Sequence, residues 1–450
     1  MKVLLPENHK SERQYATEVL LVEWLGLSVD IQFSKSTHSP EIILDNGNHL
    51  LFEDHFFGRF MDEHSYLQQE NIPSTISWES KSRNQFLAEA DIPIVFGNKH
   101  LDISTRAITC GIDIFASTFF MLSRWEEYVL TDRDGHGRLP AEASLAGRHN
   151  FLHRPIVNEY LEMLWNMLVH LGFDHPRKKH HFKPLITHDV DLPLLWPNWF
   201  SVLKKAGGDM LKRFNPKEFV FSLISGIRTK TGFGKDPFDS FDFLMDISDR
   251  AGLQSHFFFL CGDETEHDDS LPLNTPFMRQ LIQNIQERGH VIGLHPSYNT
   301  IENADMLKSE KQALEKATGF AVRFGRQHFL RFQVPGTWQM WEDAGMEWDS
   351  SMYYPEQAGF RCGTCHPFPV FNILTRKKLR LKEVPLTAME VTWKKYLKAT
   401  PEKMLGDMLS LLETVKKYQG TFVLLWHNSS FNTPEWKRFG GVYDNLLEKI

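Results

Sequence analysis

The sequence predicts an α/β fold, a distorted (β/α)7-like barrel with an additional N-terminal α/β domain. Three observations support this prediction. The chain has 450 residues, more than one domain usually holds. From residue 184 onward, short apolar runs alternate with helical patterns, as in βαβ units with a mostly parallel sheet. A charged and His-rich stretch, residues 175–181, separates this regular region from a less regular one. We therefore place the domains at residues 1–180 and 182–450.

The regular region contains about seven apolar runs, which suits a barrel or a distorted one. These predicted strands are residues 185–187, 254–260, 290–294, 328–332, 347–350, 379–386 and 421–426. The helices predicted between them are residues 240–250, 276–288, 304–318, 337–344 and 401–418. Several of these helices are followed by a Gly, which supplies the left-handed residue that closes a helix. In such folds, catalytic residues gather at the C-terminal ends of the strands.

The N-terminal region mixes helical and strand-like patterns. Helices are predicted at residues 13–25, 112–130 and 155–171, and a β-hairpin at residues 42–52 turns at an Asn-Gly pair. Several charged side chains of this region are interpreted as exposed helix charge with no catalytic part. They are Arg124, Glu126, Glu127, His136 and Arg138.

Composition excludes some classes of protein. The net charge is −7 and no Lys/Arg face dominates, so we expect no nucleic-acid partner. No run approaches the roughly 20 apolar residues of a membrane span. The first residues lack the apolar core of a secretory signal, and four cysteines in so long a chain favour reduced thiols. We therefore expect a cytoplasmic location, while the oligomeric state stays open.

Two carboxylates end the first strand of the regular region. Side chains alternate along a strand, so Asp189 and Asp191 point the same way if the strand continues through them. Two ionised carboxylates this close repel each other, and a divalent cation or a shared proton relieves the repulsion. The other interpretation of this segment is a strand end followed by an Asp that caps a helix. The tripeptide Asp189-Val190-Asp191 alone does not decide between a metal site and this structural role.

Histidines end two further strands. His295 follows residues 290–294 and precedes a Pro, and His427 closes the last strand. A neutral imidazole is a common metal ligand, although a single His at such a position is more often structural. Three strands that end in Asp or His carry more weight, because parallel strand ends meet at one mouth of a barrel.

The motifs around these residues resemble those of the polysaccharide deacetylase superfamily, the NodB-like, carbohydrate esterase family 4-like group. The similar segments are Thr187 to Asp191, Gly289 to His295, Arg331 to Pro335, Trp348-Asp349 and Leu424 to His427. The match is closer to a bacterial subgroup with an extra N-terminal domain of unassigned function. Its expected motifs start here at His188, Gly293, Arg326 and Gly359.

The resemblance implies a metal-dependent hydrolase that removes an acetyl group from an N-acetylated sugar or a related glycan precursor. Asp189 would then be the general base and His427 the general acid, with Arg331 orienting Asp189 or the oxyanion. The divalent metal, zinc as the first choice, would be held by side chains at the strand ends. These ligands are Asp191 and His295, completed by His328 or Asn299.

Departures from the family pattern keep two other functions open. Asn299 stands where the family has a second ligand His, and Val190 separates two aspartates that are adjacent in the family. In the first alternative, the chain is a catalytically inactive glycan-binding module of the same fold that has lost a ligand. Alternatively, it would be a metal-dependent amidase that acts on a non-sugar amide.

One further motif, Cys362-Gly363-Thr364-Cys365-His366, matches the pattern of covalent haem attachment. Haem attachment belongs to exported proteins, and zinc would need a second cysteine pair that the chain lacks. The resembled subgroup also carries Gly-Phe-Arg-x-Gly-Thr at this place. We therefore expect neither haem nor zinc at these cysteines.

Overall fold

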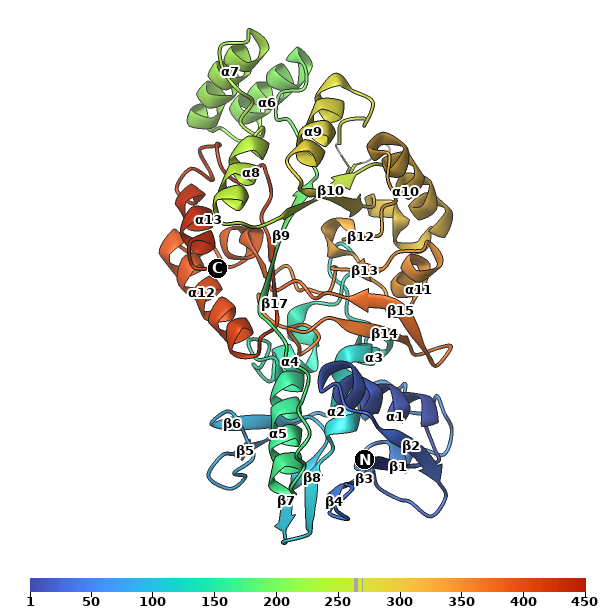
Figure 1. The fold of residues 1–450 in the computed structure, drawn as a ribbon. Coiled ribbons are helices and arrows are strands. Elements are labelled where there is room, and N and C mark those ends of the chain that lie inside the picture. The colour runs from blue at the N-terminus through green and yellow to red at the C-terminus, as the bar shows by residue number, and fades with distance from the viewer. Residues whose placement is uncertain (263–265, 269) are drawn as a thin grey trace. The chain divides into compact units, whose positions relative to one another are not determined.

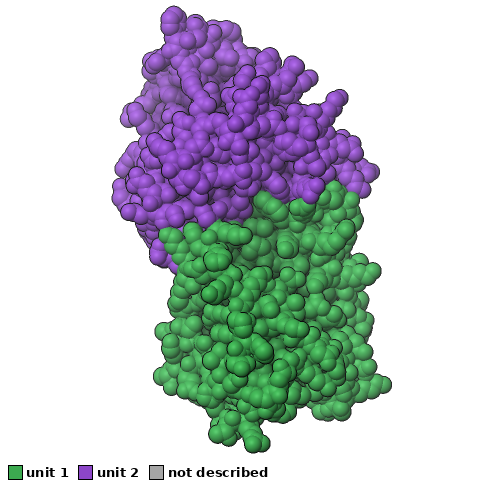
Figure 2. Space-filling model, viewed as in Figure 1, with its two compact units in different colours: residues 1–183, 330–387, 414–421 green, residues 184–329, 388–413, 422–450 purple. Residues whose placement is uncertain are grey.

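The computed structural model describes residues 1–262, 266–268 and 270–450 and has a mixed α/β fold with several sheets (Figure 1). It forms two compact units, which Figure 2 colours separately. Unit 1 contains residues 1–183, 330–387 and 414–421, and unit 2 contains residues 184–329, 388–413 and 422–450. Each unit thus combines segments that are distant in the sequence. The predicted division at residues 180–182 follows chain order alone and stays a prediction.

Unit 1 contains a six-stranded sheet in the order β2-β1-β3-β4-β8-β7. The predicted hairpin is its β3–β4 pair, which is antiparallel and turns through Gly47 with a φ of 80°. A separate antiparallel pair, β5–β6, lies in the same unit. The strands are β1 Lys2–Pro6, β2 Asp30–Ser34, β3 Glu41–Ile43, β4 His49–Phe52, β5 Ser77–Ser80, β6 Asp91–Ile94, β7 Gly97–Ile103 and β8 Ala107–Ile112.

The helices of unit 1 follow the predicted ones with two interruptions. The helix expected at residues 13–25 is α1 followed by a π-helical segment, Glu18–Trp24. The helix expected at residues 112–130 is broken at Arg124, whose φ of 54° is left-handed and ends a right-handed helix. The elements are α1 Lys10–Thr17, α2 Ile114–Ser123, α3 Trp125–Val129, α4 Leu145–Arg148, α5 Ile156–His170, α11 Gly336–Asp343, β13 Trp348–Asp349, β14 Phe368–Asn372 and β15 Lys377–Glu383.

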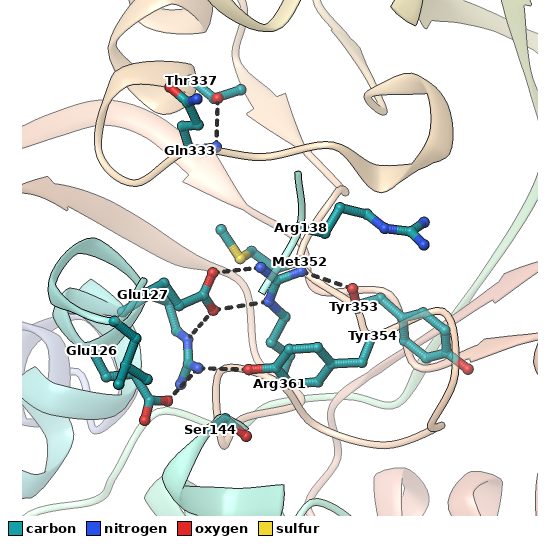
Figure 3. A network of polar contacts seen from close by, with 12 residues as sticks. Glu126, Glu127, Arg138, Ser144, Gln333, Thr337, Met352, Tyr353, Tyr354 and Arg361 are labelled. Atoms are coloured by element: carbon teal, nitrogen blue, oxygen red, sulfur yellow. Dashed lines mark hydrogen bonds and ion pairs between the residues drawn. The ribbon is translucent and has the colours of Figure 1, made fainter. Parts of the chain in front are cut away.

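The charges that the sequence analysis interpreted as exposed are buried in unit 1, so that interpretation is wrong for Arg124, Glu126 and Glu127. Figure 3 shows the network that they form with Arg361. Arg124 donates from Nε to Glu127 at 2.8 Å and from Nη2 to Glu126 at 2.5 Å. Arg361 donates to both carboxylate oxygens of Glu127. Two guanidinium groups therefore neutralise two carboxylates, and the network joins α3 to the loop around Arg361.

The same is true of Arg138, which is buried and pairs with Asp134 at 2.7 Å. Cys362 and Cys365 are also buried, and burial raises the pKa of both thiols.

Unit 2 is built on a sheet with the strand order β12-β11-β10-β9-β17-β16. The pairs β9–β10, β10–β11, β11–β12 and β16–β17 are parallel. The order is linear and does not close into a ring among the described residues, so the α/β class is confirmed and a (β/α)7 barrel is not shown. The strands are β9 Lys183–Val190, β10 Ser255–Leu260, β11 Val291–His295, β12 Phe324–Gly325, β16 Ala388–Met389 and β17 Thr421–Leu425.

One predicted strand of this region is wrong. Residues 328–332 begin with a short 3-10 turn, His328–Leu330, in which Phe329 has a φ of 58°. A left-handed residue cannot continue an extended strand. The strand that pairs with β11 is instead β12, only two residues long and earlier in the chain.

Helices complete unit 2, and no helix of the described residues is long and apolar enough to cross a membrane. Three of them, α6, α7 and α13, were not predicted. The helices are α6 Trp199–Leu211, α7 Pro216–Lys230, α8 Phe241–Arg250, α9 Pro276–Glu287, α10 Ala304–Thr318, α12 Pro401–Lys417 and α13 Gly440–Leu447. The strands between them are filled with buried apolar residues, such as Phe257, Ile292 and Val423.

Candidate metal centre

The register of the parallel strands aligns their C-terminal ends. Asp189 of β9 lies beside Phe258 of β10, and Leu260 of β10 lies beside His295, the last residue of β11. Strand β17 is the other neighbour of β9, and His427 follows it after Trp426. Polar side chains from the ends of β9, β11 and β17 are therefore brought together at one edge of the sheet.

Asp189 is buried and is held by a guanidinium group. Nη1 of Arg326 donates to Oδ1 of Asp189 at 2.8 Å and to Oγ1 of Thr187 at 3.0 Å. The guanidinium also lies 5.1 Å from the centre of the Phe258 ring. Arg326 thus fixes one oxygen of Asp189, while the other, Oδ2, lies 3.7 Å from Nε2 of His295.

The contact with Asp189 that the sequence analysis assigned to Arg331 is made by Arg326. Arg331 belongs to unit 1, where its Nε donates to the carbonyl oxygen of His136 at 2.9 Å. The difference has a local cause, because β12 ends at Gly325 and Arg326 follows it directly. The prediction placed the strand later, at residues 328–332, and took Arg331 from the resemblance of residues 331–335 to a motif of the family.

Three side chains have the arrangement of metal ligands. Asp191, His295 and His328 each offer one ligand atom, and these atoms lie within 4.8 Å of one another. Nε2 of His295 is 3.1 Å and Nε2 of His328 is 3.9 Å from Oδ1 of Asp191. Bonds of roughly 2.0–2.2 Å to a tetrahedral zinc separate two ligand atoms by about 3.4 Å. The observed separations bracket that value.

Hydrogen bonds orient both histidines. Nδ1 of His295 donates to the carbonyl oxygen of Arg326 at 2.6 Å, and Nδ1 of His328 donates to Oδ1 of Asp268 at 2.7 Å. Because each Nδ1 carries its proton toward an acceptor, Nε2 is the atom directed at Asp191. Metal-binding histidines are usually fixed by such a partner on the other nitrogen. Asp268 is itself held by the backbone N–H of Tyr298, at 3.0 Å and 3.2 Å.

The electrostatics of the cluster favour a positive charge between these atoms. Oδ1 of Asp191 is buried and makes no hydrogen bond to the described residues, although Nε2 of His295 is near. Burial opposes ionisation of Asp191, but His328, His295 and His427 hold its pKa well below the ordinary value. Burial likewise opposes a charge on His295, but Asp189 and Asp191 raise its pKa. A buried carboxylate oxygen that lacks a hydrogen bond and faces two imidazoles fits a divalent cation.

His427 lies near the other oxygen of the same carboxylate. Its Nδ1 donates to Oε1 of Glu390 at 2.7 Å, and its Nε2 lies 3.7 Å from Oδ2 of Asp191. Burial lowers the pKa of His427, but Glu390 and then Asp191 outweigh it and raise the pKa to about 10. His427 is therefore a proton carrier at neutral pH. Glu390 also accepts from Ser430 at 2.7 Å.

Sequence reasoning missed Asp268, Arg326 and Glu390. Glu390 follows β16, a strand of two residues with no recognisable pattern. Arg326 was visible as the first residue of a motif, but its strand was misplaced. Asn299, the alternative ligand, is exposed in the 3-10 turn Tyr298–Glu302, and its role as a ligand stays a prediction.

Comparison with known proteins gives two kinds of match. Residues 1–172 match the model of a family of unknown function, DUF7033. No curated protein matches the chain. Among solved structures, a Mycobacterium smegmatis protein described as a polysaccharide deacetylase is 15% identical, with 60% of this chain and 84% of that chain covered and a TM-score of 0.40.

Two further solved structures are similar over the same share of the chain. A Pseudomonas aeruginosa PAO1 protein, also described as a polysaccharide deacetylase, is 10% identical over 62% of this chain and 90% of that chain, with a TM-score of 0.37. A CE4 family pseudoenzyme from Bacillus anthracis is 12% identical over 61% of this chain and 63% of that chain, with a TM-score of 0.30. The similar structures thus include polysaccharide deacetylases and a pseudoenzyme.

Proposed function

We propose that this protein is a metal-dependent hydrolase that removes an acetyl group from an N-acetylated sugar or a related glycan precursor. One observation supports the proposal most. Oδ1 of Asp191 is buried without a hydrogen bond and faces two imidazoles whose other nitrogens are hydrogen-bonded, while Asp189 lies near His295 and His427 lies near Oδ2 of Asp191. A cation site flanked by a carboxylate and a charged imidazole has the parts that amide hydrolysis needs.

Asp191, His295 and His328 would hold the ion, and zinc suits their oxygen and nitrogen donors. When bound, the ion would polarise the acetyl carbonyl and lower the pKa of a water molecule. The four carboxylates in these contacts, Asp189, Asp191, Asp268 and Glu390, face one guanidinium, which leaves a formal charge of −3. A divalent ion together with the proton on His427 brings this charge to zero.

Asp189 would act as the general base. Arg326 holds its Oδ1 by a charge-assisted hydrogen bond, so Oδ2 is the oxygen that accepts a proton from the attacking water. Arg326 thereby takes the orienting role that the sequence suggested for Arg331. The carboxylate is kept in one orientation, which is what a base must have to act on a fixed water molecule.

His427 would act as the general acid. With its pKa raised to about 10, it carries a proton at neutral pH and can donate it to the departing amine. Glu390 fixes the ring through Nδ1, so Nε2 is the donating nitrogen.

Two other functions remain to be separated from this one. Asn299, which stands where the resembled family has a ligand His, favours an inactive glycan-binding module. A metal-dependent amidase for a non-sugar amide would use the same groups. The test is release of acetate from acetylated sugar oligomers and from simple acetamides by purified protein with zinc. Acetate from sugars alone supports the proposal, acetate from simple acetamides alone supports the amidase, and sugar binding without acetate supports the binding module.

A further inference from the structure

The helical hairpin α6–α7 is inserted between β9 and α8 and forms one end of unit 2 in Figure 1. The side chain of Asn198 caps α6 and that of Asn215 caps α7, where Pro216 occupies the first helical position. The two helices pack on each other, since Oγ of Ser222 donates to Asp209 at 2.7 Å.

The face of α6 that does not pack on α7 is apolar and exposed. At 3.6 residues per turn, its large side chains fall on one side of the helix. Phe200 is 71% exposed and Leu211 is 75% exposed, whereas Val202 and Ala206 on the opposite side are buried. The exposed residues of this face are Trp199, Phe200, Leu203, Met210 and Leu211.

Helix α7 repeats this pattern with Val220, Ile224 and Ile227, all of them exposed. Phe214 between the helices and Phe233 after α7 are each 81% exposed. Single exposed apolar residues are normal, but such a concentration within one hairpin marks an interaction surface.

The hairpin is also strongly basic. Residues 199–235 contain eight Lys and Arg against two acids, a net charge of +6 in a chain whose total is −7. Both acidic residues form ion pairs within the hairpin, Asp209 with Arg213 at 2.5 Å and Glu218 with Lys205 at 3.9 Å. Four exposed cations have no ion pair among the described residues. They are Lys204, Lys212, Lys217 and Arg228.

We propose that the α6–α7 hairpin binds the surface of membranes that contain anionic phospholipids. Apolar side chains beside lysines are the composition of helices that lie in a membrane interface. Protein interfaces, in contrast, are depleted in Lys. Trp199 adds the aromatic residue that prefers the level of the headgroups. With 13 residues, α6 is about 20 Å long and lies in the interface without crossing the roughly 30 Å apolar core.

The connection to the metal centre is short and fixed. Seven residues separate Asp191 from Trp199. Within them, the backbone N–H groups of Leu195 and Trp196 donate to Asp236 at 2.8 Å and 2.7 Å, and Nε1 of Trp196 donates to Ser225 of α7 at 3.1 Å. A hairpin bound to a membrane therefore keeps the strand end with Asp191 near that membrane. Lipid binding needs no hydrolysis, so this inference stands independently of the proposed function.

The experiment is co-sedimentation of the full chain with vesicles of phosphatidylglycerol and phosphatidylcholine, or of phosphatidylcholine alone. The wild-type protein should bind only the anionic vesicles, and high salt should weaken the binding. Replacing three lysines, Lys204→Gln, Lys212→Gln and Lys217→Gln, should lower the partition coefficient about a hundredfold. The matched control, Lys308→Gln, Lys316→Gln and Lys403→Gln, changes the same charge elsewhere in unit 2 and should bind like the wild type.

A second pair of variants tests the apolar face. Phe200→Ser with Leu203→Ser should abolish binding at low salt, whereas the exposed control pair Phe320→Ser with Leu397→Ser should not. Thermal melting checks that all variants are folded. Equal binding to neutral vesicles would overturn the proposal. Failure of the wild-type protein to bind any vesicle would also overturn the proposal. If light scattering then shows a dimer that the Phe200 and Leu203 changes dissociate, the hairpin joins two copies of the chain.

Discussion

The two units each bury a cluster of charged side chains, and the clusters differ in how their charges are balanced. In unit 1, Arg124 and Arg361 face Glu126 and Glu127, one cation for each anion (Figure 3). Burial opposes ionisation of Glu127, but Arg361 and Arg124 outweigh it and lower its pKa to about 2. In unit 2, among the described residues, the ion-pair partners of the carboxylates are the guanidinium of Arg326 and several imidazoles.

This difference separates a structural network from a site prepared for chemistry. Buried ion pairs persist when every charge has a partner, and such a network holds segments together without needing a ligand. The cluster of unit 2 has surplus negative charge, which protons on histidines or a bound cation must balance. Charged residues in both regions look alike in the sequence. Only the arrangement of partners distinguishes the balanced cluster from the one whose side chains could hold an ion.

The largest effect is expected from Asp189→Asn. The amide keeps the shape of the carboxylate but cannot accept the proton, so the rate of acetate release should fall about a thousandfold. Metal content should not change, because Asp189 is not among the proposed ligands. Steady-state kinetics and metal analysis measure both. Full activity of the variant on a substrate of the wild-type protein would remove Asp189 from the role of base.

In unit 1, Arg361→Met should destabilise the fold without affecting the metal. The change leaves Glu127 buried beside a single guanidinium, which should lower the free energy of unfolding by about 3–5 kcal/mol in urea titrations. Arg380→Met is the matched control, because Arg380 is 92% exposed in its pair with Glu342 and should contribute less than about 1 kcal/mol. Equal effects of the two changes would mean that the network of unit 1 is not a structural one.

Asp268→Asn tests the hydrogen bonds that orient the ligands of unit 2. Loss of the carboxylate that holds Nδ1 of His328 should weaken zinc binding about 10–100-fold in a competition titration with a chelating dye. Asp305→Asn, an exposed change at the start of α10, serves as the control. Unchanged zinc affinity in Asp268→Asn would show that His328 is not a ligand.

The smallest effect concerns pH and contrasts His366, a buried histidine of unit 1, with His427 of unit 2, whose pKa is raised. Burial, and then His180, lower the pKa of His366 in unit 1 to about 3. In the unfolded chain this pKa is about 6.5, so the unfolded state binds a proton first as the pH falls. His366 therefore contributes stability above about pH 6.5 that is lost progressively down to about pH 3.

This loss amounts to about 2 kcal/mol between pH 6.5 and pH 5. The His366→Gln variant keeps a donor for the carbonyl oxygen of Tyr418 but cannot be protonated, so its stability should fall less over this range. Urea unfolding of both proteins at the two pH values measures the difference. Identical pH dependence would show that His366 is not the group responsible.

The sequence predicted the elements that have long, regular patterns. The alternation of apolar runs and helices gave β9, β10, β11 and β17 within a few residues. Parallel strands bring their ends to one edge, which is why Asp189, Asp191, His295 and His427 lie together. Groups on irregular backbone could not be found in this way. Arg326 and Glu390 each follow a strand of only two residues, too short to carry a periodic signal.

The sequence analysis did not predict the helices of the α6–α7 hairpin, for a different reason. Helical patterns are usually interpreted by assuming that the apolar side packs against the protein. In α6 the large apolar residues face outward, and the buried side carries Val202, Ala206 and the ion-paired Asp209. Similarly, the charges at Arg124 and Glu126 were expected on the surface, because pairing partners such as Arg361 are distant in the sequence.

The central inference, that unit 2 holds a divalent cation between Asp191, His295 and His328, is tested most directly by the metal content of the purified chain. Mass spectrometry after zinc loading and gel filtration should find one zinc ion per chain in the wild-type protein and in Asn299→Ala. The Asp191→Ala and His328→Ala variants should retain none if they are folded. A wild-type protein that retains no zinc, or variants that retain as much as the wild type, would contradict the inference.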